Sequence, residues 1–255
     1  MKIENPIQHE HAVSETVGFI LIFGIMLTGI GLITLYGYPA LLDAQQNANI
    51  RNMERNMISL QSDVKSLVYK SVPYKETTMQ VSGGTMLIRK DGGLNSKFYV
   101  DNGTINQSFP TGGIIYNSQD DATTICLENG AVHTRRWSFE EGSAMLSEPR
   151  WFYDKLTNTF VMTFITMDAT DDFAQTGVGT VAMRLNPRPT QINATASTRI
   201  NVTYDPDITN DFRIAWKNYF DSFKPVMEPL SNTTYQLGTG VNLIIKWYNV
   251  TVLSL

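Results

Sequence analysis

No charged residue occurs in the stretch TVGFILIFGIMLTGIGLITLYGYPALL, which runs from Thr16 to Leu42. At about 1.5 Å per residue, a helix of this length exceeds the roughly 30 Å of hydrocarbon in a bilayer. The stretch therefore predicts a membrane-spanning helix. Glu15 lies at its N-terminal edge, and a carboxylate beside a membrane helix costs free energy unless another group pairs with it. We therefore expect Glu15 to have a partner.

The residues before this stretch are short and polar, and they lack the clearly basic start of a secretory signal. The apolar run is longer than the core of such a signal. Its end, Gly37-Tyr38-Pro39-Ala40, does not offer the small residues that signal peptidase needs. We expect the apolar helix to stay attached to the mature protein.

Beyond Pro39 apolar residues recur at alternating intervals of 3 and 4, which predicts an amphipathic helix over residues 39–72. This apolar stripe consists of Ile50, Met53, Met57, Leu60, Val64 and Leu67. It can form a coiled coil with another chain or pack on the head domain of its own chain. Pro39 predicts a kink between the membrane helix and this helix, with Tyr36 and Tyr38 at the membrane interface.

From residue 73 onward β-branched and aromatic runs alternate with Gly-rich and Asn-Gly turns, which is typical of antiparallel sheets. Gly83-Gly84 predicts a hairpin between Met79–Val81 and Thr85–Ile88, and residues 241–255 predict two further strands. Residues 212–223 predict one short helix. The predicted fold class is α+β, a long N-terminal helix followed by an antiparallel β-sandwich-like head.

Composition and motifs narrow the function. The net charge is −4 and no basic run occurs, so we expect no nucleic-acid partner. Cys126 lies in an apolar strand-like run, which favours buried packing. The three histidines build no metal cluster, and no motif of a hydrolase or a nucleotide-binding enzyme occurs. We expect a protein that is not an enzyme and has no cofactor.

Three further signals name candidate residues. Asp168, Asp171 and Asp172 are oxygen ligands that would suit Ca²⁺, but their spacing does not match an EF-hand, and a solvated acidic turn is the favoured interpretation. Arg135-Arg136-Trp137 and Arg150-Trp151 place cations beside aromatic rings, either as half-buried strand residues or as a binding surface. Sites for N-glycosylation occur at Asn102, Asn106, Asn193, Asn201, Asn232 and Asn249.

The N-terminal segment HAVSETVGFILIF, residues 11–23, resembles that of archaeal type IV pilin-like proteins. The resemblance implies a class III signal peptide that a prepilin peptidase cuts between Ala12 and Val13, with His11 in the basic position. It also implies that Glu15 pairs with the new α-amino group of a neighbouring subunit. His11 replaces the usual Arg or Lys, and Glu15 would be the third mature residue, whereas the familiar bacterial pattern has the glutamate fifth.

The expected organisation is a leader at residues 1–12, a transmembrane helix at 13–38, the amphipathic helix at 39–72 and an extracellular head at 73–255. The resemblance implies a cytoplasmic N-terminus before processing and a place at the cell surface. Its partners would be membrane lipid, prepilin peptidase and like subunits in a filament for adhesion or motility. The alternatives are a monomeric, single-pass surface binding protein and an anchored hydrolase that uses acidic residues.

Overall fold

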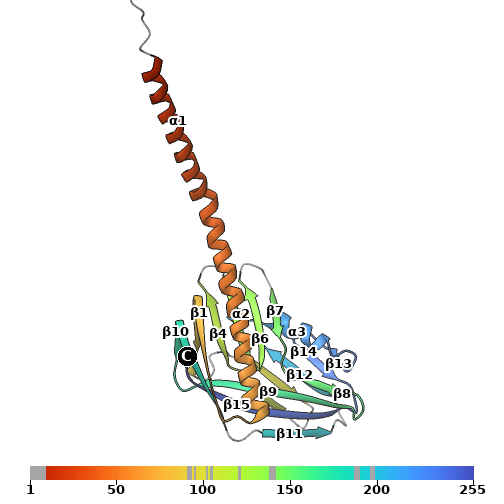
Figure 1. Ribbon diagram of the computed structural model, residues 1–255. Coiled ribbons are helices and arrows are strands. Elements are labelled where there is room, and N and C mark those ends of the chain that lie inside the picture. Colours follow the sequence, from red (N-terminus) through yellow and green to blue (C-terminus); the bar gives the residue numbers. More distant parts are fainter. Residues whose placement is uncertain are drawn as a thin grey trace, which may run out of the picture. The chain divides into compact units, whose positions relative to one another are not determined.

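A computed structural model describes residues 10–90, 94, 96–101, 103, 106–119, 122–137, 142–186, 190–195 and 199–255, with side chains from Glu15 onward except at residues 194 and 195. The chain divides into two compact units, Met1–Ala48 and Asn49–Leu255. The fold is α+β, since a long apolar N-terminal helix precedes a large β domain in which most strand pairs are antiparallel (Figure 1).

The first unit is helical throughout its described part. Helix α1 (Glu10–Leu32) continues through a π-helical turn, η1 (Ile33–Gly37), into α2 (Tyr38–Lys70). In this turn the backbone N–H of Tyr38 donates to the carbonyl of Ile33, five residues back. Pro39 has no N–H to donate and its ring crowds the preceding turn. The irregularity that Pro39 predicts therefore takes the form of a widened turn, which is one of the usual causes of helix bending.

The apolar stripe of α2 packs within the second unit. All six of its residues are at most 8% exposed, and they belong to one buried cluster with strands of the large sheet. Of the two possibilities that the heptad spacing allows, the helix takes the second and packs on the head of its own chain. Gln61 is buried beside them, although it is polar and is not part of the apolar stripe.

In the described part of the chain, ten strands form a large sheet, and its order is β7-β6-β5-β4-β1-β10-β15-β9-β8, with β11 also paired to β15. Its strands are β1 (Tyr74–Ile88), β4 (Gly113–Ser118), β5 (Thr123–Glu128), β6 (Ala131–Arg136), β7 (Ser143–Ser147), β8 (Phe152–Asp154), β9 (Thr159–Ala169), β10 (Phe173–Leu185), β11 (Thr190–Thr195) and β15 (Asn242–Ser254). A smaller sheet has the order β13-β14-β12-β2-β3. Its strands are β2 (Lys97–Asp101), β3 (Asn106–Pro110), β12 (Ile200–Asp205), β13 (Met227–Pro229) and β14 (Thr234–Leu237), and α3 (Arg213–Asp221) precedes β13.

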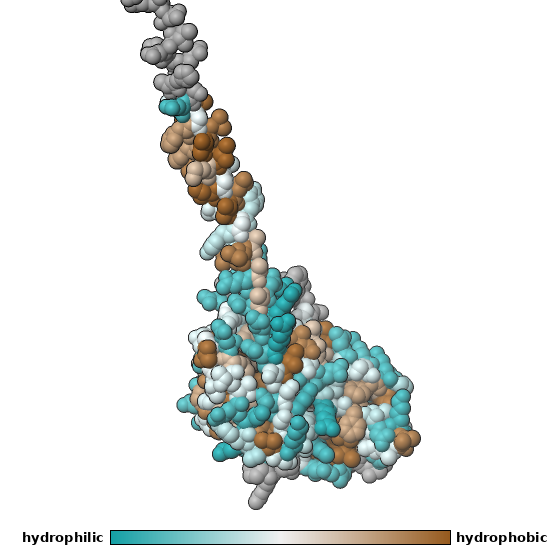
Figure 2. All heavy atoms as spheres, viewed as in Figure 1, coloured by the Kyte–Doolittle hydropathy of each residue, from teal (hydrophilic) through white to brown (hydrophobic). Residues whose placement is uncertain are grey.

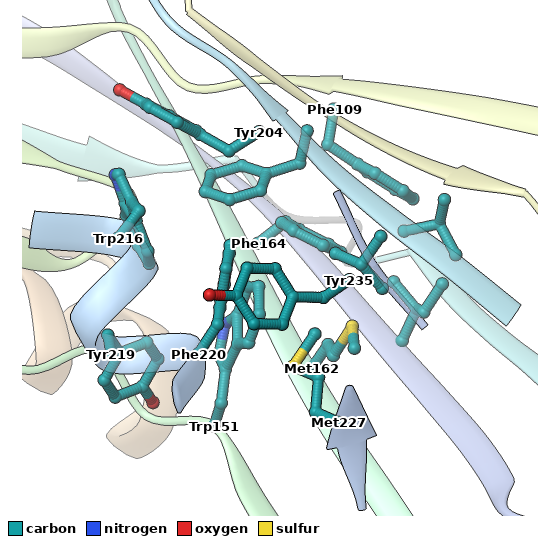
Figure 3. Packing of buried hydrophobic residues seen from close by; sticks show 14 of the residues in the cluster. Phe109, Trp151, Met162, Phe164, Tyr204, Trp216, Tyr219, Phe220, Met227 and Tyr235 are labelled. Carbon is teal, nitrogen blue, oxygen red and sulfur yellow. The ribbon is translucent and has the colours of Figure 1, made fainter. Parts of the chain in front are cut away.

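Two buried clusters lie on opposite faces of the large sheet. Ile114 and Tyr116 of β4 pack in the cluster with α2, whereas Ile115 between them packs in the other cluster. This alternation follows from the two-residue period of a strand. The second cluster joins the large sheet to the small sheet and α3, and it is rich in aromatic rings such as Trp216 and Phe164 (Figure 3). The head thus has a helix on one face and a second β layer on the other.

The turn between β5 and β6 follows its sequence signal, whereas two strands differ from what the sequence predicts. Asn129 and Gly130 have φ values of 48° and 70°, as the two-residue β5–β6 hairpin requires. The predicted hairpin at Gly83-Gly84 is wrong, because β1 runs through both glycines, with only a register shift against β10 between Val81 and Met86. Residues 242–254 likewise form one long strand, whose pairing with β9 is parallel. The short helix predicted within residues 212–223 is confirmed as α3.

Candidate functional site

The apolar part of the first unit is exposed on all sides. Among the side chains described from Glu15 to Leu42, none is buried. Phe19 is 69% exposed and Leu35 is 70% exposed, which is the opposite of a core helix. Among the described residues, one helix is long and apolar enough to cross a membrane, and this is that helix. Its apolar surface is the brown segment in Figure 2. A surface of this kind requires lipid or other apolar helices around it.

Small residues hollow out one face of α1. Gly24, Thr28 and Gly29 lie in a groove of about 540 Å³ walled by isoleucine and leucine side chains. The Thr28 hydroxyl donates to the Gly24 carbonyl at 2.8 Å, so its polar group is satisfied within the helix. A Cβ added at Gly18, Gly24, Gly29 or Gly31 would meet no atom within 4 Å. Nothing in the described part of the helix requires glycine at these positions.

Glu15 stands exposed in α1 at the start of the apolar segment. Among the described side chains it has no ion-pair partner, and the next carboxylate along the chain is Asp43, beyond the apolar run. The predicted processing residues His11, Ala12 and Val13 lie in the helical part of α1, but their side chains are outside the described residues. The structure therefore places Glu15 at one edge of an apolar surface, without an ion pair to any side chain that it describes.

The acidic loop does not assemble a cation site. Asp168 accepts from the Ala169 N–H at 2.7 Å, Asp172 from the Lys90 N–H at 2.7 Å, and Asp171 from the N–H of Asp172 at 2.8 Å. Each carboxylate is thus used to cap backbone near it. Within the part of the chain that the structure describes, no group of three or more His, Cys, Asp or Glu residues could hold a metal ion.

The glycosylation candidates differ in exposure. Asn106, Asn193, Asn232 and Asn249 are exposed, as attachment of a glycan requires. Asn201 is half-buried, and its side-chain oxygen accepts from the Gln236 amide at 2.9 Å. Asn102 is outside the described residues. The four exposed sites remain candidates, and Asn201 is the least accessible of those described.

A buried polar cluster in the head has no counterpart in the sequence signals. The Glu128 carboxylate is fully buried and accepts from Ser96 Oγ at 2.5 Å and Thr111 Oγ1 at 2.9 Å. The Tyr204 hydroxyl lies 3.3 Å from both carboxylate oxygens. His133 Nε2 is 4.0 Å from Glu128 Oε2 and is equally buried. The residues come from β5, β6, β12 and the connections around β2 and β4, so only the folded topology brings them together.

Burial changes the titration of this cluster. It raises the pKa of Glu128 from 4.5 to about 6, although the hydroxyl donors oppose the shift. It lowers the pKa of His133 from 6.5 to about 3. Neither side chain reaches solvent, so neither can meet a substrate. The arrangement can hold a proton and tie the two sheets together.

Of the remaining candidates, Cys126 and Trp151 are buried and Arg135 is half-buried, whereas Arg136, Trp137 and Arg150 are exposed. Cys126 is buried, and burial raises the pKa of its thiol, which keeps it protonated and unreactive. Trp151 is a core residue whose Nε1–H donates to the Thr163 carbonyl at 2.8 Å. Trp137, by contrast, is 51% exposed beside Arg135. Another cation–π contact joins Arg150 and Tyr69, with the guanidinium carbon 4.6 Å from the ring centroid.

Comparison with known proteins gives a family without an assigned role. A family model described as "Family of unknown function (DUF7289)" matches residues 11–233. An uncharacterised protein of the archaeon Archaeoglobus fulgidus is 28% identical over 78 residues, which make up 31% of this chain and 30% of that protein. The match therefore spans less than a third of that relative's length. No solved structure matches the chain.

Proposed function

The chain belongs to the family of unknown function DUF7289, and from its own residues we propose that it is a non-enzymatic archaeal type IV pilin-like subunit. Its N-terminal helix is inserted in the membrane with the N-terminus in the cytoplasm, and the β head lies outside the cell. After prepilin peptidase cuts between Ala12 and Val13, the helix leaves lipid and packs among like helices in a surface filament.

The observation that carries this proposal is the apolar helix in which no side chain from Glu15 to Leu42 is buried, with the Glu15 carboxylate at its N-terminal edge. Lipid alone would satisfy the apolar side chains, but it gives Glu15 no partner. In an assembly the freed α-amino group of a neighbouring subunit supplies one. A carboxylate within a membrane costs about 2.5 to 3.5 kcal/mol at the centre and less at the boundary, so the pairing favours assembly over dispersal.

The glycines of α1 point the same way. Glycine inside a helix costs about 0.5 to 1 kcal/mol relative to alanine. Gly24 and Gly29 make no close approach within the chain that would explain glycine there. Together with Thr28 they open a groove into which a second helix can fit closely. The archaeal source of one relative agrees with the archaeal resemblance of the N-terminal segment.

Mass spectrometry of the mature N-terminus separates this proposal from a lone anchored protein. The protein is expressed with its leader in a host that has a prepilin peptidase and is recovered from the membrane and filament fractions. We expect a mature chain that begins at Val13. An intact Met1, or a cut beyond Pro39, would refute the pilin-like role.

The pairing of Glu15 has its own test. Glu15→Gln keeps the size of the side chain and removes its charge, and we expect incorporation into filaments to fall while membrane insertion persists. Asp43→Asn is the matched control, because it makes the same change at the other end of the charge-free run and leaves the Asp43 carbonyl that accepts from Asn47. If both variants assemble like the parent protein, the pairing does not drive assembly.

A further inference from the structure

The head carries a surface cleft of about 370 Å³ that the proposed role in a filament does not use. Its lining comes from the ends of β1, β4 and β6, the start of β5 and the loop that follows β12. Arg89 follows β1, Asn117 lies in β4, Trp137 follows β6, and Asp207 lies in the loop between β12 and α3. A volume of this size is within the range of small-molecule sites.

Trp137 is an exposed ring held in a fixed orientation. Its indole is 51% exposed, yet its Nε1–H donates to Thr124 Oγ1 at 2.9 Å, and its backbone N–H donates to the Ala122 carbonyl at 2.9 Å. The guanidinium carbon of Arg135 lies 5.0 Å from the ring centroid. Arg135 covers one face of the ring, and the remaining exposed part of the indole presents an ordered apolar surface to the solvent.

Charged and uncharged polar side chains line the same cleft. Thr124 Oγ1, which accepts from Trp137, also donates to Asn117 Oδ1 at 2.9 Å, so the ring and the amide are positioned by one hydroxyl. Asp207 is 6% exposed, and its Oδ1 accepts from the N–H groups of Thr209 and Asn210, at 2.8 and 2.9 Å. Arg89 adds an exposed guanidinium. The lining thus offers a cation, a carboxylate and an amide beside a flat apolar ring.

We propose that this cleft binds a neutral saccharide. A sugar ring has one face of C–H groups, which packs against an indole, and an edge of hydroxyls that both donate and accept hydrogen bonds. Trp137 takes the C–H face, and the exposed side chains of Asn117 and Arg89 take the hydroxyls. An anionic ligand fits less well, because the Asp207 carboxylate lies in the same lining. The proposal stands independently of filament assembly, since every residue that carries it is in the head.

The test uses the full chain, purified in lauryldimethylamine oxide because a detergent with a sugar headgroup would compete. Maltotriose, chitotriose and mannotriose are titrated by isothermal titration calorimetry, which does not depend on the tryptophan that the variant removes, with AMP as a probe of a different class. We expect saturable binding of at least one sugar. Trp137→Ala should weaken it by about tenfold or more, which is the loss expected when an aromatic stacking partner is removed.

Phe152→Ala is the matched control, since Phe152 is 47% exposed and lines a different cleft of the head. It should leave sugar binding unchanged. Asn117→Ala is a second variant at an exposed position, and it should also weaken binding if Trp137→Ala does not fold. The proposal is overturned if no sugar binds saturably up to about 10 mM, if binding survives in both cleft variants, or if AMP alone binds.

Discussion

Gln61 is a polar residue within an otherwise apolar helix face, and it joins α2 to the sheet. Its side chain is 1% exposed, and its amide donates to the Gly130 carbonyl at 2.7 Å and the Glu148 carbonyl at 3.1 Å. Its oxygen accepts from Ser147 Oγ at 2.6 Å. Gln61 therefore satisfies the β5–β6 turn and the end of β7, which α2 would otherwise cover with apolar atoms.

Gln61→Leu should lower the free energy of unfolding by about 1 to 3 kcal/mol, because it leaves the buried Gly130 carbonyl without its donor. Urea unfolding of the full chain, followed by tryptophan fluorescence, measures the change. Ser62→Ala is the neighbouring control at an exposed position and should change the value by less than about 0.5 kcal/mol. Equal effects of both variants would mean that the Gln61 hydrogen bonds contribute nothing net.

Glu128 and His133 make a second prediction at the residue scale. The pKa of Glu128 is raised to about 6, so its contribution to stability is full below pH 4.5 and is lost as the pH rises to 6. The pKa of His133 is lowered to about 3, so its contribution is full above pH 6.5 and is lost as the pH falls. Between pH 4.5 and 6 the pair holds one proton in both the folded and the unfolded state.

Between pH 4.5 and 6, Glu128 and His133 together should therefore not make the free energy of unfolding of the parent protein change with pH. In Glu128→Gln the histidine acts alone, and the free energy of unfolding should fall by about 2 kcal/mol, relative to the parent, from pH 6 to 4.5. Urea unfolding at several pH values measures this difference. Glu228→Gln, at an exposed carboxylate, should run parallel to the parent. A parallel profile for Glu128→Gln would contradict the raised pKa.

At the scale of elements, β1 depends on two glycines that the sequence suggested were a turn. A Cβ at Gly84 would lie 2.3 Å from the Asn117 carbonyl oxygen and 2.7 Å from the Tyr116 ring. Gly83 has a φ of 67°, in the left-handed region. The pair therefore lets β1 shift register against β10 while it stays close to β4, and no side chain fits at Gly84.

Gly84→Ala should destabilise the head by about 2 to 3 kcal/mol, since the strand must move away from backbone atoms of β4. Ser82→Ala is the control, because it retains the Ser82 carbonyl that accepts from the Tyr116 hydroxyl. Thermal unfolding monitored by circular dichroism compares the two variants. A Gly84→Ala protein as stable as the control would show that β1 and β4 can separate at no cost.

Local sequence patterns predicted the helix α2 and the β5–β6 hairpin well, but they did not predict the pairing of strands that are distant in the sequence. The heptad spacing gave the buried face of α2, and Asn129-Gly130 gave a hairpin, because both depend on neighbours in the sequence. The interpretation of Gly83-Gly84 was wrong since a close approach and a turn both require glycine, and only the position of β4 distinguishes them. The Glu128 cluster could not be predicted, because its members share no spacing and meet through strand order alone.

For the whole molecule, the two units have separate requirements. In the described residues, both buried clusters of the head begin no earlier than Ile50, and the apolar surface of the first unit contributes to neither. A fragment of residues 49–255 should therefore be soluble without detergent and unfold within a few degrees of the head in the full chain. A fragment of residues 62–255 lacks Met53, Met57 and Leu60, which are fully buried, and it exposes the sheet face that they cover.

Loss of these three side chains and of Gln61 removes several kcal/mol of burial from a domain whose total stability is about 5 to 15 kcal/mol, so the shorter fragment should aggregate. Size-exclusion chromatography and thermal unfolding of the two fragments test this directly. A folded, monomeric shorter fragment would mean that the β layers alone form the domain. Equal aggregation of both would mean that the head needs the membrane helix, and only a soluble longer fragment leaves that helix free for lipid and for neighbouring subunits.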